Sequence, residues 1–272
     1  IGYCATRILE GDLVAFPTET VYGLGANIYN ENAIEKIFKY KERPNTNPLI
    51  VHIFDFKQLI DLTELNNEEL EIVKKVTDVY WPGALTLILP KSKKVSYSLT
   101  AGTEFVGIRM PSNKIALDLL KKSNVPIAAP SANKYCHVSP TNYKHVLEEF
   151  KNKELTIIPN DKEILDIGIE SSIFSFDFKR KIFELLRPGF ITVNMISNIL
   201  PNYTCKISYE KDSTPGSHKK HYTINKKTFL LSDSSEIIFD KNKVSFIDFT
   251  NKYKRSNFAR FYQISTEFNY IF

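Results

Sequence analysis

GDLVAFPTETVYGLGANIY, residues 11–29, contains the first strand expected in this chain and the turn that follows it. The apolar run Leu13–Phe16 has the length of a buried strand and is bounded by a glycine and a proline. Beyond it, Gly23 and Gly25 have no Cβ, which would let the backbone approach a ligand closely. The stretch therefore predicts a strand that leads into a binding loop.

Three cations, Lys39, Lys41 and Arg43, follow at the end of a helix that apolar spacing predicts over residues 31–40. A second apolar run, residues 49–53, then predicts a strand. Cations at a helix end are either a solvated face that the helix dipole favours or a site that holds an anion. The two prolines of this loop make it stiff, and stiffness favours the anion site.

Helices and strands continue to alternate along the chain. Predicted helices cover residues 68–79 and 115–122, and predicted strands cover residues 85–89, 106–110, 155–158, 172–176 and 182–186, with another from residue 125. Near the end, short apolar runs cover residues 228–231, 236–239 and 244–249 and precede a helical stretch with Phe258 and Phe261. We expect a large α/β domain over residues 1–203, a linker over residues 204–225 and a small domain over residues 226–272.

Composition narrows the classes of protein that fit. The 272 residues are 43% hydrophobic and 25% charged, which suits one large domain or one large and one small. No apolar run approaches the roughly 18 residues of a membrane span, and the first ten residues do not resemble a signal peptide. Three scattered cysteines suit a reducing compartment, so a cytoplasmic protein with no membrane partner is expected. The net charge of +5 is compatible with a polyanionic ligand.

Arg109 lies in an otherwise apolar stretch just before Pro111. An unpaired guanidinium in such a place would be costly, so the side chain either pairs with a carboxylate of the protein or reaches a ligand. Spacing alone leaves both alternatives open.

Several motifs resemble the Sua5/YrdC/YciO family, the threonylcarbamoyl-AMP synthases. PTETVYGLG at residues 17–25 and KERPNTNPLIVH at residues 41–52 resemble the family signature, and the likeness extends over roughly residues 1–200. Further matching stretches are WPGALTLIL (81–89), RMP (109–111), AAPSAN (128–133), SPT (139–141), GIESS (168–172) and LRPG (186–189).

The resemblance implies a YrdC-like fold, in which an open twisted α/β sheet surrounds a central basic cavity. It also implies a nucleotidyltransferase that forms L-threonylcarbamoyladenylate and pyrophosphate from L-threonine, bicarbonate and ATP, for the t6A modification of tRNA. ATP would be bound by Lys41, Arg43, Asn47, Ser131, Asn133, Ser139, Arg187 and Tyr222. Threonine would be bound by Thr20, His52, Arg109, Ala129 and Ser171. Lys41 and Arg43 would be the catalytic pair, acting mainly by electrostatic stabilisation and positioning.

Other implications concern metals, partners and the end of the chain. Magnesium is expected with ATP, bound chiefly by phosphate oxygens and water, because no carboxylate cluster provides a dedicated metal site. Downstream partners would be the proteins that transfer threonylcarbamoyl to tRNA. Residues 213–222 resemble the linker of the longer Sua5-type members, which folds over the active site, although Thr214 is inserted and Ser217 replaces methionine. The unit after it would be a shortened, Rossmann-like Sua5 domain.

Two alternatives come from other classes of function. The same basic cavity could bind RNA without catalysis, but aromatic residues here lie mostly in apolar runs rather than among the cations. A carbamoyltransferase related to the hydrogenase-maturation proteins is the second alternative. The motifs of P-loop kinases, zinc hydrolases and serine hydrolases are absent from the sequence. His52 is a candidate general base, although a lone histidine on a strand is more often structural.

Overall fold

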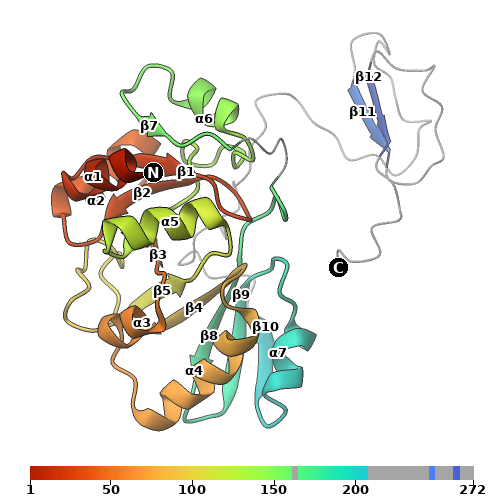
Figure 1. Ribbon diagram of the computed structural model, residues 1–272. Coiled ribbons are helices and arrows are strands. Elements are labelled where there is room, and N and C mark those ends of the chain that lie inside the picture. The colour runs from red at the N-terminus through yellow and green to blue at the C-terminus, as the bar shows by residue number, and fades with distance from the viewer. Residues whose placement is uncertain (161–164, 208–244, 249–259, 264–272) are drawn as a thin grey trace. The chain divides into compact units, whose positions relative to one another are not determined.

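The computed structural model describes residues 1–160, 165–207, 245–248 and 260–263. The chain divides into two units, residues 1–223 and residues 224–272. The first unit is a mixed α/β domain built on one large sheet (Figure 1). The predicted α/β class is therefore confirmed for this unit.

The sheet has ten strands in the order β10-β9-β8-β4-β5-β3-β6-β2-β1-β7. Its strands are β1 (Val14–Phe16), β2 (Gly23–Asn27), β3 (Ile50–His52), β4 (Leu85–Pro90), β5 (Phe105–Arg109), β6 (Ile127–Ala128), β7 (Thr156–Ile157), β8 (Ser172–Asp177), β9 (Ile182–Arg187) and β10 (Thr204–Ile207). Parallel pairs such as β3 with β5 alternate with antiparallel pairs such as β3 with β6. This mixed pairing brings the first strands of the chain beside strands more than a hundred residues later.

Seven helices lie in the described part of the chain. They are α1 (Gly2–Leu9), α2 (Glu31–Lys41), α3 (Phe56–Leu62), α4 (Asn67–Tyr80), α5 (Lys114–Ser123), α6 (Tyr143–Glu149) and α7 (Val193–Ile199). Asn30 caps the start of α2, because its side chain accepts a hydrogen bond from the backbone N–H of Ala33 at 3.1 Å. None of these helices combines the length and the hydropathy that a membrane crossing requires.

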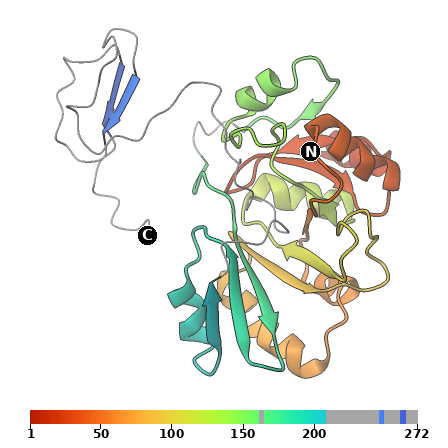
Figure 2. The same cartoon turned by 180° about the vertical axis from the view of Figure 1, so that it is seen from behind.

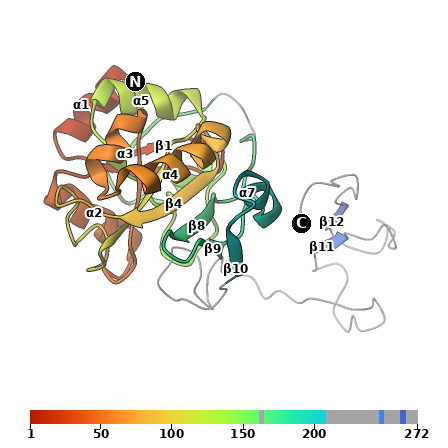
Figure 3. The ribbon, with the colours of Figure 1, turned by 90° about the horizontal axis from the view of Figure 1, so that it is seen from below.

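Helices α3, α4 and α5 lie along the same side of the sheet, which is clearest in the view from below (Figure 3). Seen from behind, strands β8 and β9 lie in front of the orange helices (Figure 2). The apolar residues of the strands and of the helix faces pack between these layers, and Val51, Leu87 and Phe174 have no exposed surface. The core therefore fixes the strand ends from which the polar groups described below project.

The predicted binding loop is wrong in its extent: Gly25 does not line the pocket, whereas Gly23 does. Both glycines belong to strand β2, which pairs with β1 on one side and β6 on the other. A Cβ at Gly25 would lie 2.8 Å from Phe16 and 2.9 Å from Ile127, so close packing between neighbouring strands requires this glycine. The pocket-facing turn is therefore shorter than predicted and ends at Gly23, the first residue of β2.

Two boundaries near the end of the chain also differ from the prediction. Residues 204–207 were assigned to the linker, but they form β10 and pair in parallel with β9. In the second unit, β11 (Ser245–Asp248) pairs in parallel with β12 (Arg260–Gln263). The first of these strands agrees with the run predicted at residues 244–249, whereas Phe261 lies in a strand and not in the predicted helix. The remaining predictions after residue 207, including the linker and Tyr222, lie outside the described residues.

Candidate active site

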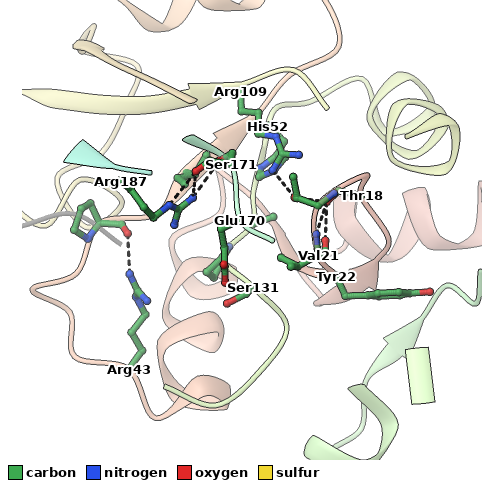
Figure 4. Close-up of a pocket in the computed structure, with 16 residues that line it drawn as sticks. Thr18, Val21, Tyr22, Arg43, His52, Arg109, Ser131, Glu170, Ser171 and Arg187 are labelled. Carbon is green, nitrogen blue, oxygen red and sulfur yellow. Dashed lines mark hydrogen bonds between the residues drawn. The ribbon is translucent and has the colours of Figure 1, made fainter. Parts of the chain in front are cut away.

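A pocket of about 570 Å³ lies where several strand ends meet (Figure 4). Its lining residues are Thr18, Thr20, Val21, Tyr22, Gly23, Arg43, Pro48, Ile50, His52, Arg109, Ala129, Pro130, Ser131, Glu170, Ser171 and Arg187. They come from the turn after β1, the loop between α2 and β3, the ends of β5 and β9, and the segments after β6 and before β8. The sheet therefore gathers segments that are far apart in the sequence around one polar cavity.

Eight of the predicted site residues line this pocket. They are Thr20, Arg43, His52, Arg109, Ala129, Ser131, Ser171 and Arg187. Three guanidinium groups are among them, and each arginine is at most 8% exposed. Such a concentration of fixed, largely desolvated positive charge favours a ligand with several negative charges.

Arg43 and Arg187 form the most cationic part of the pocket. The Arg43 Nη2 donates a hydrogen bond to the Pro48 carbonyl at 3.0 Å, and no carboxylate in the described residues pairs with its guanidinium. Burial, with a further contribution from the charge of Arg187, lowers the pKa of Arg43 to about 10. The Arg187 Nε and Nη2 donate to the Ser171 carbonyl at 3.0 and 2.8 Å. The Arg187 Nη2 also donates to Oγ of Ser171 at 3.0 Å. Both guanidinium groups thus line the pocket in fixed positions, an arrangement that favours an anionic ligand.

Arg109 pairs with a carboxylate of the protein, which is one of the two alternatives that the sequence left open. Its Nη2 lies 2.6 Å from Oε1 of Glu19, and both side chains are at most 5% exposed. The Nη1 donates to Oγ1 of Thr20 at 2.9 Å, and the Nε donates to the Gly83 carbonyl at 3.3 Å. These bonds use three of the five guanidinium N–H groups, so two remain for a ligand in the pocket. Pairing within the protein and contact with a ligand are therefore compatible.

His52 lines the pocket but is a poor candidate for a general base. Burial, and then the positive charge of Arg109, lower the pKa of the imidazole to about 3. Its Nδ1 is buried and has no hydrogen-bond partner in the described structure. An imidazole this weakly basic stays neutral near pH 7 and has little tendency to take up a proton. The suggestion that His52 is the base is therefore not supported, whereas a neutral contact with a ligand remains compatible with its position.

The low pKa of His52 leads to a testable dependence of stability on pH. The unfolded state takes up a proton near the ordinary histidine pKa of about 6.5, whereas the folded state resists protonation until about pH 3. Stability is therefore lost as the pH falls through this window, by about 2 kcal/mol between pH 7 and pH 5. Urea denaturation of the wild type and of His52→Asn at both pH values measures the difference. Equal losses in the two proteins would contradict the assignment.

Lys41, one of the two expected catalytic cations, lies behind the pocket wall. Its ammonium donates hydrogen bonds to the carbonyls of Ser131 and Asn133, and its own carbonyl accepts one from the backbone N–H of Tyr135 at 2.7 Å. Burial, followed by the charge of Arg43, lowers its pKa well below the ordinary lysine value. In this structure Lys41 fixes the loop that presents Ser131, and its contact with a triphosphate stays a prediction.

The other predicted ATP residues lie near the pocket without lining it. Asn47 donates to the Tyr135 hydroxyl at 3.0 Å, and the Asn133 amide donates to the carbonyls of Lys134 and His137 at 2.8 Å. The Ser139 hydroxyl donates to the Glu170 carboxylate. Asn47 and Asn133 are almost completely buried, so in this structure they hold the loops beside the pocket, and their contact with ATP stays a prediction.

Sequence reasoning missed three acidic or hydroxyl residues of this region. Glu170 lines the pocket, and so does Thr18 in the turn after β1. Glu19 forms the ion pair with Arg109. Both Glu19 and Thr18 lie inside the PTET motif, and Glu170 lies inside GIESS. Membership of these motifs was a signal that the residues belong to the site. It did not reveal their partners, which are distant in the sequence for the two glutamates and depend on the turn geometry for Thr18.

Comparison with known proteins identifies the family. A family model described as "Telomere recombination", which covers the Sua5, YciO and YrdC proteins, matches residues 6–189. The threonylcarbamoyl-AMP synthase of Pyrococcus abyssi is 42% identical over 85% of this chain and 67% of its own length, and that of Bacillus subtilis is 43% identical over 88% and 68%. A crystal structure of P. abyssi Sua5 complexed with L-threonine matches with a TM-score of 0.73 at 42% identity, over 81% of this chain and 64% of that one.

The chain therefore spans about two thirds of the length of these relatives. The family model covers strands β1 to β9 and the pocket motifs from PTET to LRPG. The YrdC-like fold and the resemblance inferred from the motifs are confirmed. This chain belongs to the Sua5/YciO/YrdC family.

Proposed function

We propose that this chain is a threonylcarbamoyl-AMP synthase, which forms L-threonylcarbamoyladenylate and pyrophosphate from L-threonine, bicarbonate and ATP. The observation that carries the proposal is the pocket lined by Arg43, Arg109 and Arg187, in a chain 42–43% identical to two synthases of this name. The P. abyssi relative binds L-threonine in its crystal structure, which supports an amino-acid ligand.

The reaction brings several negative charges close together. The threonine amine attacks the carbon of bicarbonate, water leaves, and a carbamate forms. A carbamate oxygen then attacks the α-phosphorus of ATP, and pyrophosphate leaves with the electron pair of the broken P–O bond. We assign the phosphate groups to Arg43 and Arg187, whose guanidinium groups are already oriented by backbone carbonyls. Fixed cations in a largely desolvated site stabilise such a transition state without needing to reorient.

The amino acid is assigned to the opposite part of the pocket, formed by Thr20, His52, Arg109, Ala129 and Ser171. The two unused N–H groups of Arg109 suit a carboxylate. Neutral His52, on the strand next to that of Arg109, adds no charge there, so the amine is not repelled by a second cation. The group that removes the amine proton is not assigned among these residues.

Magnesium is proposed to enter together with ATP. The described residues hold no cluster of three or more His, Cys, Asp or Glu side chains that could bind a metal ion. Within the described lining of the pocket, Glu170 is the one carboxylate, and it accepts a hydrogen bond from Ser139. The described lining of the pocket thus offers one carboxylate for the ion, and phosphate oxygens and water would supply the other ligands. Bound there, the ion would neutralise phosphate charge.

Wider roles follow from the proposed product. A reactive acyl adenylate requires prompt use, so we propose that proteins transferring threonylcarbamoyl to tRNA act next. The three cysteines form no disulfide, which supports the reducing cytoplasm as the compartment. The alternative of RNA binding without catalysis would use the same cations, and it predicts binding that weakens with salt and needs no threonine.

Pyrophosphate release tests the proposal directly. Purified protein with ATP and magnesium is expected to release pyrophosphate only when L-threonine and bicarbonate are both present, because the carbamate is the attacking nucleophile. Reactions with L-serine, without amino acid and without bicarbonate are the controls. Release that does not depend on threonine, or none from folded protein, would reject the synthase and leave the RNA-binding alternative to be tested.

A further inference from the structure

The turn after β1 contains a short chain of hydrogen bonds that ends at the pocket. The Thr18 hydroxyl donates to the Val21 carbonyl at 2.6 Å, since a carbonyl oxygen can only accept. The hydroxyl oxygens of Thr18 and Thr20 lie 2.8 Å apart. The Nη1 of Arg109 donates to the same Thr20 oxygen at 2.9 Å. Thr18 also accepts from the backbone N–H groups of Thr20 and Val21 at 3.1 and 3.2 Å.

These contacts determine where each hydroxyl proton lies. A hydroxyl has one proton, and that of Thr18 points to the Val21 carbonyl. We assign the proton between the two threonine oxygens to Thr20, because without it two lone pairs would face each other at 2.8 Å. The two lone pairs of the Thr18 oxygen are then shared between this short contact and the longer contacts from the two backbone N–H groups. A guanidinium can only donate, so Arg109 uses one lone pair of the Thr20 oxygen. Thr20 is left with one lone pair and no proton for a ligand.

The arginine of this chain of bonds is itself held in place. Glu19 binds Nη2 of Arg109 at 2.6 Å with Oε1 and accepts from the backbone N–H of Ser112 at 3.1 Å with Oε2. Both ends of the carboxylate are used, so Arg109 cannot rotate away from Thr20 without breaking a buried ion pair. The polarity of the Thr20 hydroxyl is thus fixed from two sides, by Thr18 and by Arg109.

We propose that Thr18 is a positioning residue that makes Thr20 an acceptor-only contact for the amino acid; this deepens, and rests on, the proposed function. Thr20 then receives a hydrogen bond from an N–H or O–H of the ligand and repels a carboxylate oxygen. The free N–H groups of Arg109 attract that carboxylate instead. The Thr20 acceptor beside the Arg109 donors thus fits an amino acid in one orientation, with its carboxylate at Arg109 and an N–H or O–H group at Thr20.

Isothermal titration of the full chain with L-threonine tests this role. Thr18→Val keeps the shape of the side chain but frees the Thr20 proton, which can then turn into the pocket and oppose the ligand donor. A weakening of about 5- to 10-fold is expected, the scale of one hydrogen bond. Thr18→Ser retains the hydroxyl and should bind within about 2-fold of the wild type. Affinity for a non-hydrolysable ATP analogue should be unchanged in both variants, because Thr18 lies on the amino-acid side.

A double-mutant cycle separates positioning from general damage. Thr20→Val removes the acceptor itself and should weaken threonine binding by a similar factor; this variant keeps the claim testable if Thr18→Val does not fold. Combining the two changes should cost little more than Thr20→Val alone, since Thr18 acts through Thr20.

The outcomes divide clearly between the two proposals. Wild-type affinity in folded Thr18→Val, equal losses in Thr18→Ser and Thr18→Val, or equal losses of threonine and nucleotide binding would overturn the role of Thr18. Threonine binding that responds to Thr18 without any pyrophosphate release would instead reject the synthase reaction and retain this role. A folded wild type that binds no amino acid would overturn both.

Discussion

Arg43→Ala is expected to lower kcat/KM for threonine-dependent pyrophosphate release by about 10²- to 10³-fold, the usual cost of removing one preorganised charge donor from an active site. The guanidinium is 8% exposed, lines the pocket and is held by the Pro48 carbonyl rather than by a carboxylate. Its positive charge is therefore available to phosphate groups. The loss should appear in kcat as well as in KM for ATP, because the charge on the phosphates grows as the bond to pyrophosphate breaks.

Two further variants make this comparison specific. Arg43→Lys keeps a charge but loses the planar fork, so it should recover only part of the activity. Arg180→Ala removes an arginine whose side chain is 78% exposed and should leave the rate unchanged. Equal activity in Arg43→Ala and Arg180→Ala, with both proteins folded, would show that Arg43 does not act on the phosphates.

Much of the fold could be predicted because local signals agree with the tertiary structure. Helix α2 begins after Asn30 and places its apolar residues against β2, as the helical spacing required. Strand β4 is apolar except for the buried Thr86 and ends at Pro90, and a largely apolar run of this length is typical of a strand buried in the middle of a sheet. Where the pattern was regular, the predicted and observed bounds agree closely.

The errors occur where neighbours in space decide the outcome. Gly25 resembled a ligand-binding glycine, yet its missing Cβ leaves room for Phe16 and Ile127 on adjacent strands. Tertiary packing therefore overrode the reading of the turn. The family motif assigns Lys41 to ATP, and that role stays a prediction, but the sequence did not indicate that backbone carbonyls at least 90 residues later bind its ammonium. A single sequence contains no signal for such a contact.

The same limit applies to the acidic residues. Glu19 and Arg109 are 90 positions apart, and Ser139 and Glu170 are 31 apart, so neither pair has a periodic pattern. Only the costliness of an unpaired buried arginine indicated that Arg109 needed a partner. Physical chemistry thus predicted that Arg109 meets either a protein carboxylate or a ligand, and the fold determined that Glu19 is the carboxylate that pairs with it.

Glu19→Ala is expected to lower the free energy of unfolding by about 3–5 kcal/mol, because it leaves the Arg109 guanidinium buried without its carboxylate. Both side chains are at most 5% exposed, and Glu19 also binds the backbone of Ser112, so water cannot readily replace the lost oxygens. A loss of this size is a large part of the total stability of a typical domain. Urea denaturation at neutral pH measures it. Asp78→Ala breaks an exposed ion pair with Lys74 and should cost at most about 0.5 kcal/mol.

A double variant distinguishes the loss of the charge partner of Arg109 from the loss of the volume that the Glu19 side chain fills. Glu19→Leu combined with Arg109→Met removes both charges and fills similar space, so it should recover much of the stability that Glu19→Ala loses. The same protein should bind threonine poorly, because the donors of Arg109 and the fixed lone pair of Thr20 are both disturbed. A double variant as unstable as Glu19→Ala would mean that packing, and not charge compensation, is what Glu19 provides. Recovered stability without recovered threonine binding would show that the fold does not need the buried Glu19–Arg109 pair. The pair would then serve ligand recognition.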